Sequence, residues 1–157
     1  MIIRKGTQED MPAVLELIRE LAIFEKEPEA VVVTVEDLER DGFGNNPLFH
    51  TFIAEVGQEI VGMALYYYRY STWKGKTIHL EDLIVKEKMR GTGLGMALYT
   101  EIMKQGKADG VRRIEWNVLD WNQNAVDFYE KSGAKVLEDW RVVQMTEEGI
   151  HTFLNNR

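Results

Sequence analysis

A glycine-rich turn, Arg-Gly-Thr-Gly-Leu-Gly at residues 90–95, is the feature of this chain that most directly indicates chemistry. It follows an apolar segment, residues 78–85, that we expect to be a buried strand, and it precedes an apolar-periodic helix from residue 96. Glycines allow close approach to the backbone, so that N–H groups can converge on phosphate oxygens. The unpaired N–H groups and positive dipole end of the following helix add to this preference. The spacing therefore predicts an anion site.

Three phosphate-binding patterns differ in their spacing. A P-loop requires a Lys-Ser or Lys-Thr pair after its last glycine, and no such pair follows here. The dinucleotide fingerprint Gly-x-Gly-x-x-Gly would place its third glycine where the chain has Met96. Residues 90–95 match Arg/Gln-x-x-Gly-x-Gly/Ala in full, which resembles the acetyl-coenzyme A pyrophosphate loop of the GNAT family of N-acetyltransferases. The alternative is a strand-to-helix connection without a ligand.

Composition limits the class of protein. The chain of 157 residues fits a single domain spanning 1–157. It has no cysteine, and its three histidines lack metal-ligand spacing, so no metal site is expected. No segment has the pattern of a membrane span or a signal peptide, so we expect a cytoplasmic protein. The net charge of −7 disfavours nucleic acid and agrees with a small cationic substrate.

The order of expected elements predicts a mixed α/β (α+β) fold. Strands are expected at residues 2–5, 49–56, 60–70, 77–85, 113–118 and 140–145. Helices are expected after Thr7, at residues 34–42, 94–108 and 122–131, and weakly near the C-terminus. A tight turn at Gly57 and Gln58 would join the second and third strands as a hairpin. The order resembles the GNAT acyl-CoA N-acyltransferase fold, a central, mostly antiparallel twisted sheet flanked by helices.

Several segments also resemble one subgroup of that family, the diamine acetyltransferases, which includes the spermidine/spermine and thialysine acetyltransferases. They are residues 39–44, 70–75, 79–82, 121–122 and 127–129. Residues 71–75 and 118–123 are more similar to the thialysine branch. The resemblance implies direct transfer of an acetyl group from acetyl-CoA to a primary amine in a ternary complex. The implied substrate is thialysine, a lysine analogue, a diamine or a polyamine, and a homodimer without nucleic-acid or membrane partners is expected.

Two residues are expected to move protons in that reaction. An alkylammonium group has an ordinary pKa near 10.4, so it must lose a proton before its nitrogen can attack a thioester. By resemblance, Glu81 assists this deprotonation and Tyr129 protonates the departing coenzyme A thiolate. An ion pair is the alternative for Glu81, and a packed core aromatic is the alternative for Tyr129. Strand alternation predicts that Glu81 and Asp82 point to opposite faces of the sheet.

The resemblance implies the other site residues as well. The backbone of the strand before the glycine turn would pair with the pantetheine arm, and Asn122 would contact the cofactor, although a helix N-cap alone explains Asn122. The expected cofactor-binding residues are Leu83, Ile84, Val85, Arg90, Gly91, Thr92, Gly93, Leu94, Gly95, Met96, Asn122 and Tyr129. A cationic chain favours carboxylates and aromatic faces. The expected substrate contacts are Phe24, Glu25, Trp73, Glu81, Asp82 and Trp140, with Glu138 and Asp139 as further candidates.

Two other functions would use the same coenzyme A turn. One is a non-catalytic acetyl-CoA-binding module, against which the candidate acid and base argue. The other is acetylation of a protein amine, which needs an open peptide groove, whereas Trp73 and the acidic residues indicate an enclosed cationic pocket. The sequence leaves the identity of the amine open.

Overall fold

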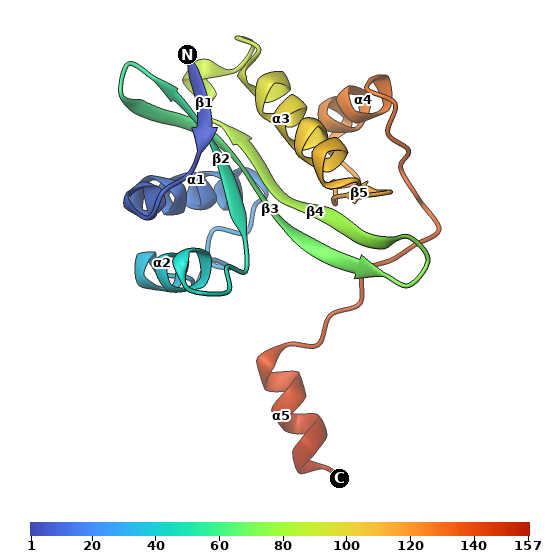
Figure 1. The fold of residues 1–157 in the computed structure, drawn as a ribbon. Coiled ribbons are helices and arrows are strands. Elements are labelled where there is room, and N and C mark those ends of the chain that lie inside the picture. Colours follow the sequence, from blue (N-terminus) through green and yellow to red (C-terminus); the bar gives the residue numbers. More distant parts are fainter. The chain divides into compact units, whose positions relative to one another are not determined.

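The computed structural model describes all of residues 1–157, which form two compact units, Met1–Asn117 and Val118–Arg157. The first unit contains one five-stranded sheet with the order β1-β2-β3-β4-β5 (Figure 1). The strands are β1 (Ile2–Lys5), β2 (His50–Val56), β3 (Glu59–Ser71), β4 (Gly75–Val85) and β5 (Ile114–Glu115). The prediction of a single domain over the whole chain stays a prediction.

Neighbouring strands from β1 to β4 are antiparallel, and only β4 and β5 run parallel. This confirms the predicted mixed fold with a mostly antiparallel sheet. Gly57 and Gln58 form the tight turn between β2 and β3, and both have positive φ, 54° and 69°. Such a pair of left-handed residues matches the twist of a two-residue hairpin, as the sequence predicted.

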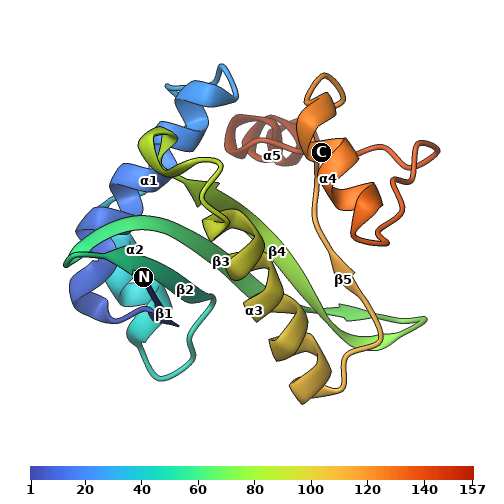
Figure 2. The ribbon, with the colours of Figure 1, turned by 90° about the horizontal axis from the view of Figure 1, so that it is seen from above.

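Helices cover both faces of the sheet. On one face lie α1 (Met11–Phe24) and α2 (Val35–Phe43), and on the other lies α3 (Leu94–Asp109) (Figures 1 and 2). Short 3-10 turns, Gln8–Asp10 and Glu87–Met89, precede α1 and α3. The period of the apolar residues explains the arrangement, because Val14 and Leu17 of α1 and Leu98 and Ile102 of α3 are fully buried. Two apolar clusters result, one on each side of the sheet.

The last two strands of the sheet separate soon after they meet. Only Ile78 and His79 of β4 pair with β5, opposite Ile114 and Glu115. The predicted strand at residues 113–118 is therefore much shorter than expected. From Leu80 onward, β4 pairs with β3 on one side and has no strand partner on the other. This leaves a row of backbone groups on β4 without strand pairing.

The second unit contains α4 (Gln123–Lys131) and α5 (Glu147–Asn155). Asn122 caps α4, as its N-cap interpretation predicted, because its Oδ1 accepts a hydrogen bond from the Ala125 N–H at 3.4 Å. Gly133 follows the helix with φ of 102°. The predicted strand at residues 140–145 is wrong, because this segment is irregular. Its Val142 and Val143 give it local β propensity, but a strand also needs a paired neighbour. No helix in the chain is both long and apolar enough to cross a membrane.

Candidate active site

The predicted anion site has the geometry of an open backbone cradle. Gly91 and Gly93 have φ of 78° and 88°, a left-handed conformation that glycine adopts without steric cost. Gly93 caps α3 and, having no side chain, makes no side-chain capping hydrogen bond to the first N–H groups of the helix. The Thr92 hydroxyl donates to the Met89 carbonyl at 2.5 Å and holds the turn. These N–H groups, at the positive end of a helix dipole, are suited to a phosphate group.

Arg90 links this turn to the neighbouring strand and helix. Its Nε donates to the Val85 carbonyl at 3.4 Å, and its guanidinium lies over the Phe24 ring, 5.6 Å from the ring centre. Phe24 is the last residue of α1, and Glu25 follows it directly. The end of α1 therefore lies close to the turn that follows β4.

The strand before the turn presents its backbone and buries its side chains. Ile84 is buried in the cluster beneath α1, whereas Leu83 and Val85 pack partly buried against the cluster beneath α3. Their side chains are core, as the sequence predicted, while the edge of β4 that faces away from β3 has no strand partner. An extended chain with amide groups could pair with such an edge. The open edge and the glycine cradle are the places that the sequence prediction assigns to the pantetheine arm and the pyrophosphate of coenzyme A.

A β-bulge places two adjacent carboxylates on the same face of the sheet. Leu65 and Tyr66 are neighbours on β3, but their partners on β4 are Asp82 and Leu80, so that Glu81 is an extra residue. Simple alternation predicted opposite faces for Glu81 and Asp82, and that prediction is wrong because the bulge interrupts the period of two. Asp82 lies opposite Leu65 on the side that α1 covers, and Glu81 accepts a hydrogen bond from Tyr67 on that same side.

Glu81 is half exposed, accepts a hydrogen bond from one neighbour and lies near a second. The Tyr67 hydroxyl donates to Glu81 Oε1 at 3.0 Å, and His79 Nε2 lies 3.7 Å from the same oxygen. The Glu81 side chain is 50% exposed, so that a ligand can reach its carboxylate from solvent. Glu81 therefore combines a fixed orientation with access to solvent.

Asp82 and Glu25 complete a cluster of three carboxyl groups with Glu81. Burial and the nearby charges of Glu81 and Glu25 raise the pKa of Asp82 from 3.8 to about 7. Burial and the charge of Glu81 also raise the pKa of Glu25. Like charges collected in a partly buried place favour a cation that would neutralise them. The cluster is therefore suited to bind an ammonium group.

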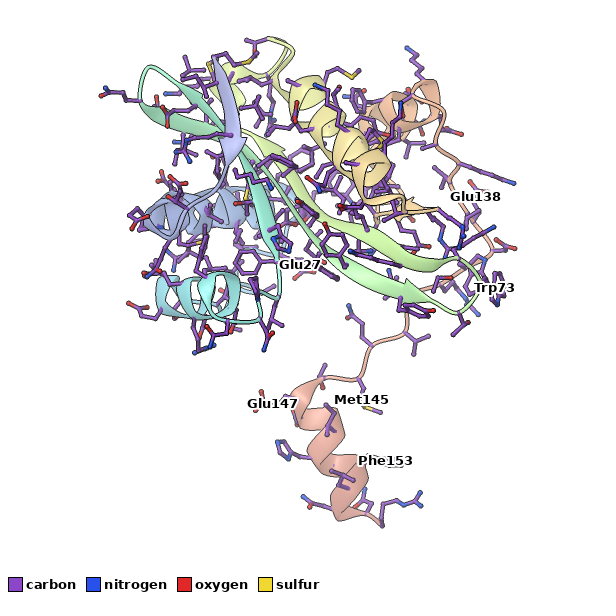
Figure 3. The ribbon with its side chains drawn as sticks, viewed as in Figure 1. Glu27, Trp73, Glu138, Met145, Glu147 and Phe153 are labelled. Atoms are coloured by element: carbon purple, nitrogen blue, oxygen red, sulfur yellow. The ribbon has the colours of Figure 1, made fainter.

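The structure brings some predicted substrate residues together and separates another. Glu25, Glu81 and Asp82 interact electrostatically, and Phe24 adjoins Glu25 at the end of α1. Trp73 is instead 77% exposed at the tip of the β3–β4 hairpin (Figure 3). Along β4, the six steps from Gly75 to Glu81 span about 20 Å at about 3.3 Å each, so Trp73 is not part of the carboxylate cluster.

The remaining predicted site residues belong to the unit Val118–Arg157. Tyr129 packs edge-on against Phe128, with ring centres 5.5 Å apart, and Trp140 is 65% exposed. Glu138 and Asp139 precede Trp140 in an irregular segment. The roles of these residues, and that of Asn122 beyond its N-cap, stay predictions.

Sequence reasoning missed three residues around Glu81, namely Tyr67, Arg69 and His79. Tyr67 and Arg69 are two residues apart on β3, and so are His79 and Glu81 on β4. A period of two places each pair on a common face, which was a detectable signal. The cross-strand register that sets Tyr67 opposite His79 required the structure.

Comparison with known proteins identifies the class that this fold and site define. Residues 11–134 match the model of the Acetyltransferase (GNAT) family. A thialysine N-epsilon-acetyltransferase of Sus scrofa is 38% identical over 161 residues, covering 98% of this chain and 91% of the relative. Human spermidine/spermine N(1)-acetyltransferase-like protein 1 is 37% identical over 162 residues, covering 99% of this chain and 22% of that protein.

The solved structure of an integron cassette protein from V. cholerae matches this chain with a TM-score of 0.80 at 18% sequence identity. The match covers 98% of this chain and 96% of the chain of that protein. At that identity the likeness shows the fold alone. The family match and the relatives together show that the chain belongs to the acetyltransferase (GNAT) family. The predicted family, subgroup and enzyme class are confirmed.

We expect Asp82→Asn to raise the free energy of unfolding at about pH 8 by about 1–3 kcal/mol, and to raise it less at about pH 5. The folded pKa of Asp82 is about 7 against an ordinary 3.8, so its ionisation opposes folding increasingly as the pH rises through that interval. Below the ordinary pKa, both states are protonated and the effect disappears. Urea unfolding of both proteins at the two pH values measures it.

Asp109→Asn is the matched control. Tyr68 donates to Asp109, and this hydrogen bond lowers the pKa of Asp109, so its ionised form stabilises the fold. The control variant should lose stability at about pH 8 relative to wild type, opposite to Asp82→Asn. A gain from Asp82→Asn that is the same at both pH values would contradict the assigned cause.

Proposed function

We propose that this chain is an acetyl-CoA-dependent N-acetyltransferase that acts on a primary amine of a small cationic substrate. The substrate class is thialysine or a lysine analogue, or a diamine or polyamine. One observation carries the proposal: the strand that holds Glu81 and Asp82 of the carboxylate cluster runs directly into a left-handed glycine turn that opens a helix. The site thus combines a place for an ammonium group with a place for a phosphate group. The relatives named above support the amine class.

Acetyl-CoA would supply an acetyl group activated as a thioester. The backbone of Leu83, Ile84 and Val85 would hold its pantetheine arm, because that edge of β4 has no strand partner. The pyrophosphate would lie on the turn and the first turn of α3, formed by Arg90, Gly91, Thr92, Gly93, Leu94, Gly95 and Met96. Asn122 is the further proposed cofactor contact, by the family resemblance.

The carboxylates would bind the amine and take its proton. A substrate ammonium entering the cluster gains from all three groups, and its charge favours the ionised form of Asp82. Glu81, half exposed and fixed by Tyr67, would accept the proton directly or through water. Asp82 and Glu25 would hold a charged group of the substrate. Phe24 and Trp140 stay proposed contacts for its apolar chain, whereas a substrate contact at Trp73, which lies outside the carboxylate cluster, rests on the family resemblance alone.

Tyr129 is the proposed proton donor to the departing thiolate, a role that rests on the family resemblance. Coenzyme A departs more readily when its sulfur is protonated as the bond to the acetyl group breaks, because the proton neutralises the negative charge that develops on the sulfur. A cytoplasmic location and a homodimer also stay predictions.

Gly93→Ala should weaken binding of coenzyme A by about 10-fold or more, because a left-handed alanine costs about 1–2 kcal/mol and moves the amides that would face the pyrophosphate. Isothermal titration with coenzyme A measures the affinity. Gly57→Ala is the matched control, since Gly57 also has positive φ, but in the β2–β3 turn. Equal affinities for wild type and Gly93→Ala would remove the turn from the cofactor site.

Incubation with acetyl-CoA and a panel of amines, with release of free thiol as the readout, tests the proposed reaction. We expect turnover with thialysine, lysine, short diamines or spermidine, and Glu81→Gln should lower kcat/KM for the preferred amine by about 100-fold. Glu55→Gln, a substitution of a glutamate on β2 that pairs with Arg4, is the control. Cofactor binding without thiol release for any amine would favour the non-catalytic binding module, and turnover with a protein amine alone would favour the other alternative.

Tyr129→Phe should lower kcat by about 10- to 100-fold and leave the affinity for coenzyme A largely unchanged. The hydroxyl that the variant lacks would act only as the thiolate departs, so its loss lowers kcat. The aromatic ring remains in the variant, so the affinity for coenzyme A is kept. Steady-state kinetics with saturating acetyl-CoA measures the change. Full turnover by this variant would exclude Tyr129 as the general acid.

A further inference from the structure

A chain of polar contacts crosses three strands and ends at Glu81. Glu115 of β5 lies 3.5 Å from the Arg69 guanidinium of β3, and Arg69 Nη1 lies 2.9 Å from His79 Nδ1 on β4. The other ring nitrogen of His79, Nε2, lies 3.7 Å from Glu81 Oε1. Tyr67 and His79 are cross-strand partners whose rings lie 5.2 Å apart, and the Tyr67 hydroxyl reaches the same Glu81 oxygen.

The partner of Nδ1 fixes which tautomer His79 adopts. A guanidinium has only N–H donors, so a ring nitrogen in contact with Arg69 must act as the acceptor. The proton of the neutral imidazole is then on Nε2, the nitrogen nearest to Glu81. The Tyr67 hydroxyl thus donates a hydrogen bond to Glu81 Oε1 at 3.0 Å, while the protonated nitrogen of His79 lies 3.7 Å from the same oxygen, beyond direct hydrogen-bond distance.

We propose that His79 is a positioning residue for Glu81: the Nε2–H dipole of its neutral ring, 3.7 Å from Oε1, adds to the hydrogen bond from Tyr67 and orients the carboxylate so that Oε2 remains free for the amine proton. This inference rests on the proposed function of Glu81 as the proton acceptor. His79 itself is 6% exposed and touches no part of the cluster other than Glu81 among the contacts described above. It therefore acts through Glu81 and not on the substrate.

The surroundings of His79 keep it in the neutral form that this role requires. Burial lowers the pKa of His79, the positive charge of Arg69 lowers it further, and the carboxylates of Glu81 and Glu115 oppose the change. Protonation of the ring would also place an N–H on Nδ1, directed at the N–H donors of Arg69, and this repulsion disfavours the charged form. A neutral donor of fixed direction thus faces Glu81, and proton transfer through the ring is not needed.

Two substitutions separate positioning from packing. His79→Phe keeps a ring but has no donor, so kcat should fall by about 10- to 100-fold while KM for acetyl-CoA stays constant, because the turn is untouched. His79→Gln restores a neutral N–H donor beside Glu81 and should recover most of the loss in kcat. Steady-state kinetics with the preferred amine gives both parameters, and circular dichroism confirms that each variant is folded.

His50→Phe is the matched control. His50 is a partly buried histidine on β2 whose ring packs tilted against Tyr66 and edge-on against Tyr68, away from the carboxylates of the cluster. Burial lowers the pKa of His50 as it does that of His79. The control variant should keep the wild-type kcat. Unchanged kcat in His79→Phe, or equal losses in His79→Phe and His79→Gln, would overturn the positioning role.

A measurement without substrate separates this inference from the proposed function. The NMR shifts of the two imidazole nitrogens of His79 in the wild-type chain near neutral pH should show a proton on Nε2 and none on Nδ1. A proton on Nδ1 would overturn the inference even if the enzyme is active. Absence of turnover with every amine, combined with the expected tautomer, would instead count against the proposed function.

Discussion

The site depends on one extra residue in a strand. Without the bulge at Glu81, the period of two would send one of the adjacent carboxylates into the layer beneath α3, which is filled by apolar side chains. With the bulge, Glu81 and Asp82 both lie on the side of α1, where Glu25 joins them. This arrangement opposes folding, since it crowds like charges in a partly buried place. The same electrostatic cost makes the cluster complementary to a cation.

The strand β4 links the two halves of the proposed chemistry. It carries the carboxylates, exposes an unpaired backbone edge where it separates from β5, and ends in the turn that opens α3. One continuous strand thus relates an ammonium site, an edge for an extended ligand and an anion cradle. Because the strand is fixed by β3 on one side and by packed helices on both faces, these parts are held without a ligand.

Patterns that depend on local backbone chemistry were predicted well. The left-handed turn at Gly57 and Gln58, the Asn122 cap and the glycine turn before α3 all follow from the conformational preferences of a few adjacent residues. Predictions that depend on distant partners were less accurate. The segment 140–145 has strand-forming residues but no paired neighbour, and β5 is shorter than its apolar pattern indicated.

The sequence by itself determined the family, the order of most elements, and the turn in which Gly91 and Gly93 adopt left-handed angles, because motif spacing and side-chain type encode these locally. It also pointed to Glu81 and Asp82 as chemically unusual. Only the tertiary structure decided that both carboxylates share one face and that His79 and Tyr67 contact Glu81. Both results follow from the register between β3 and β4, which depends on pairing across the sheet and cannot be read from either strand alone.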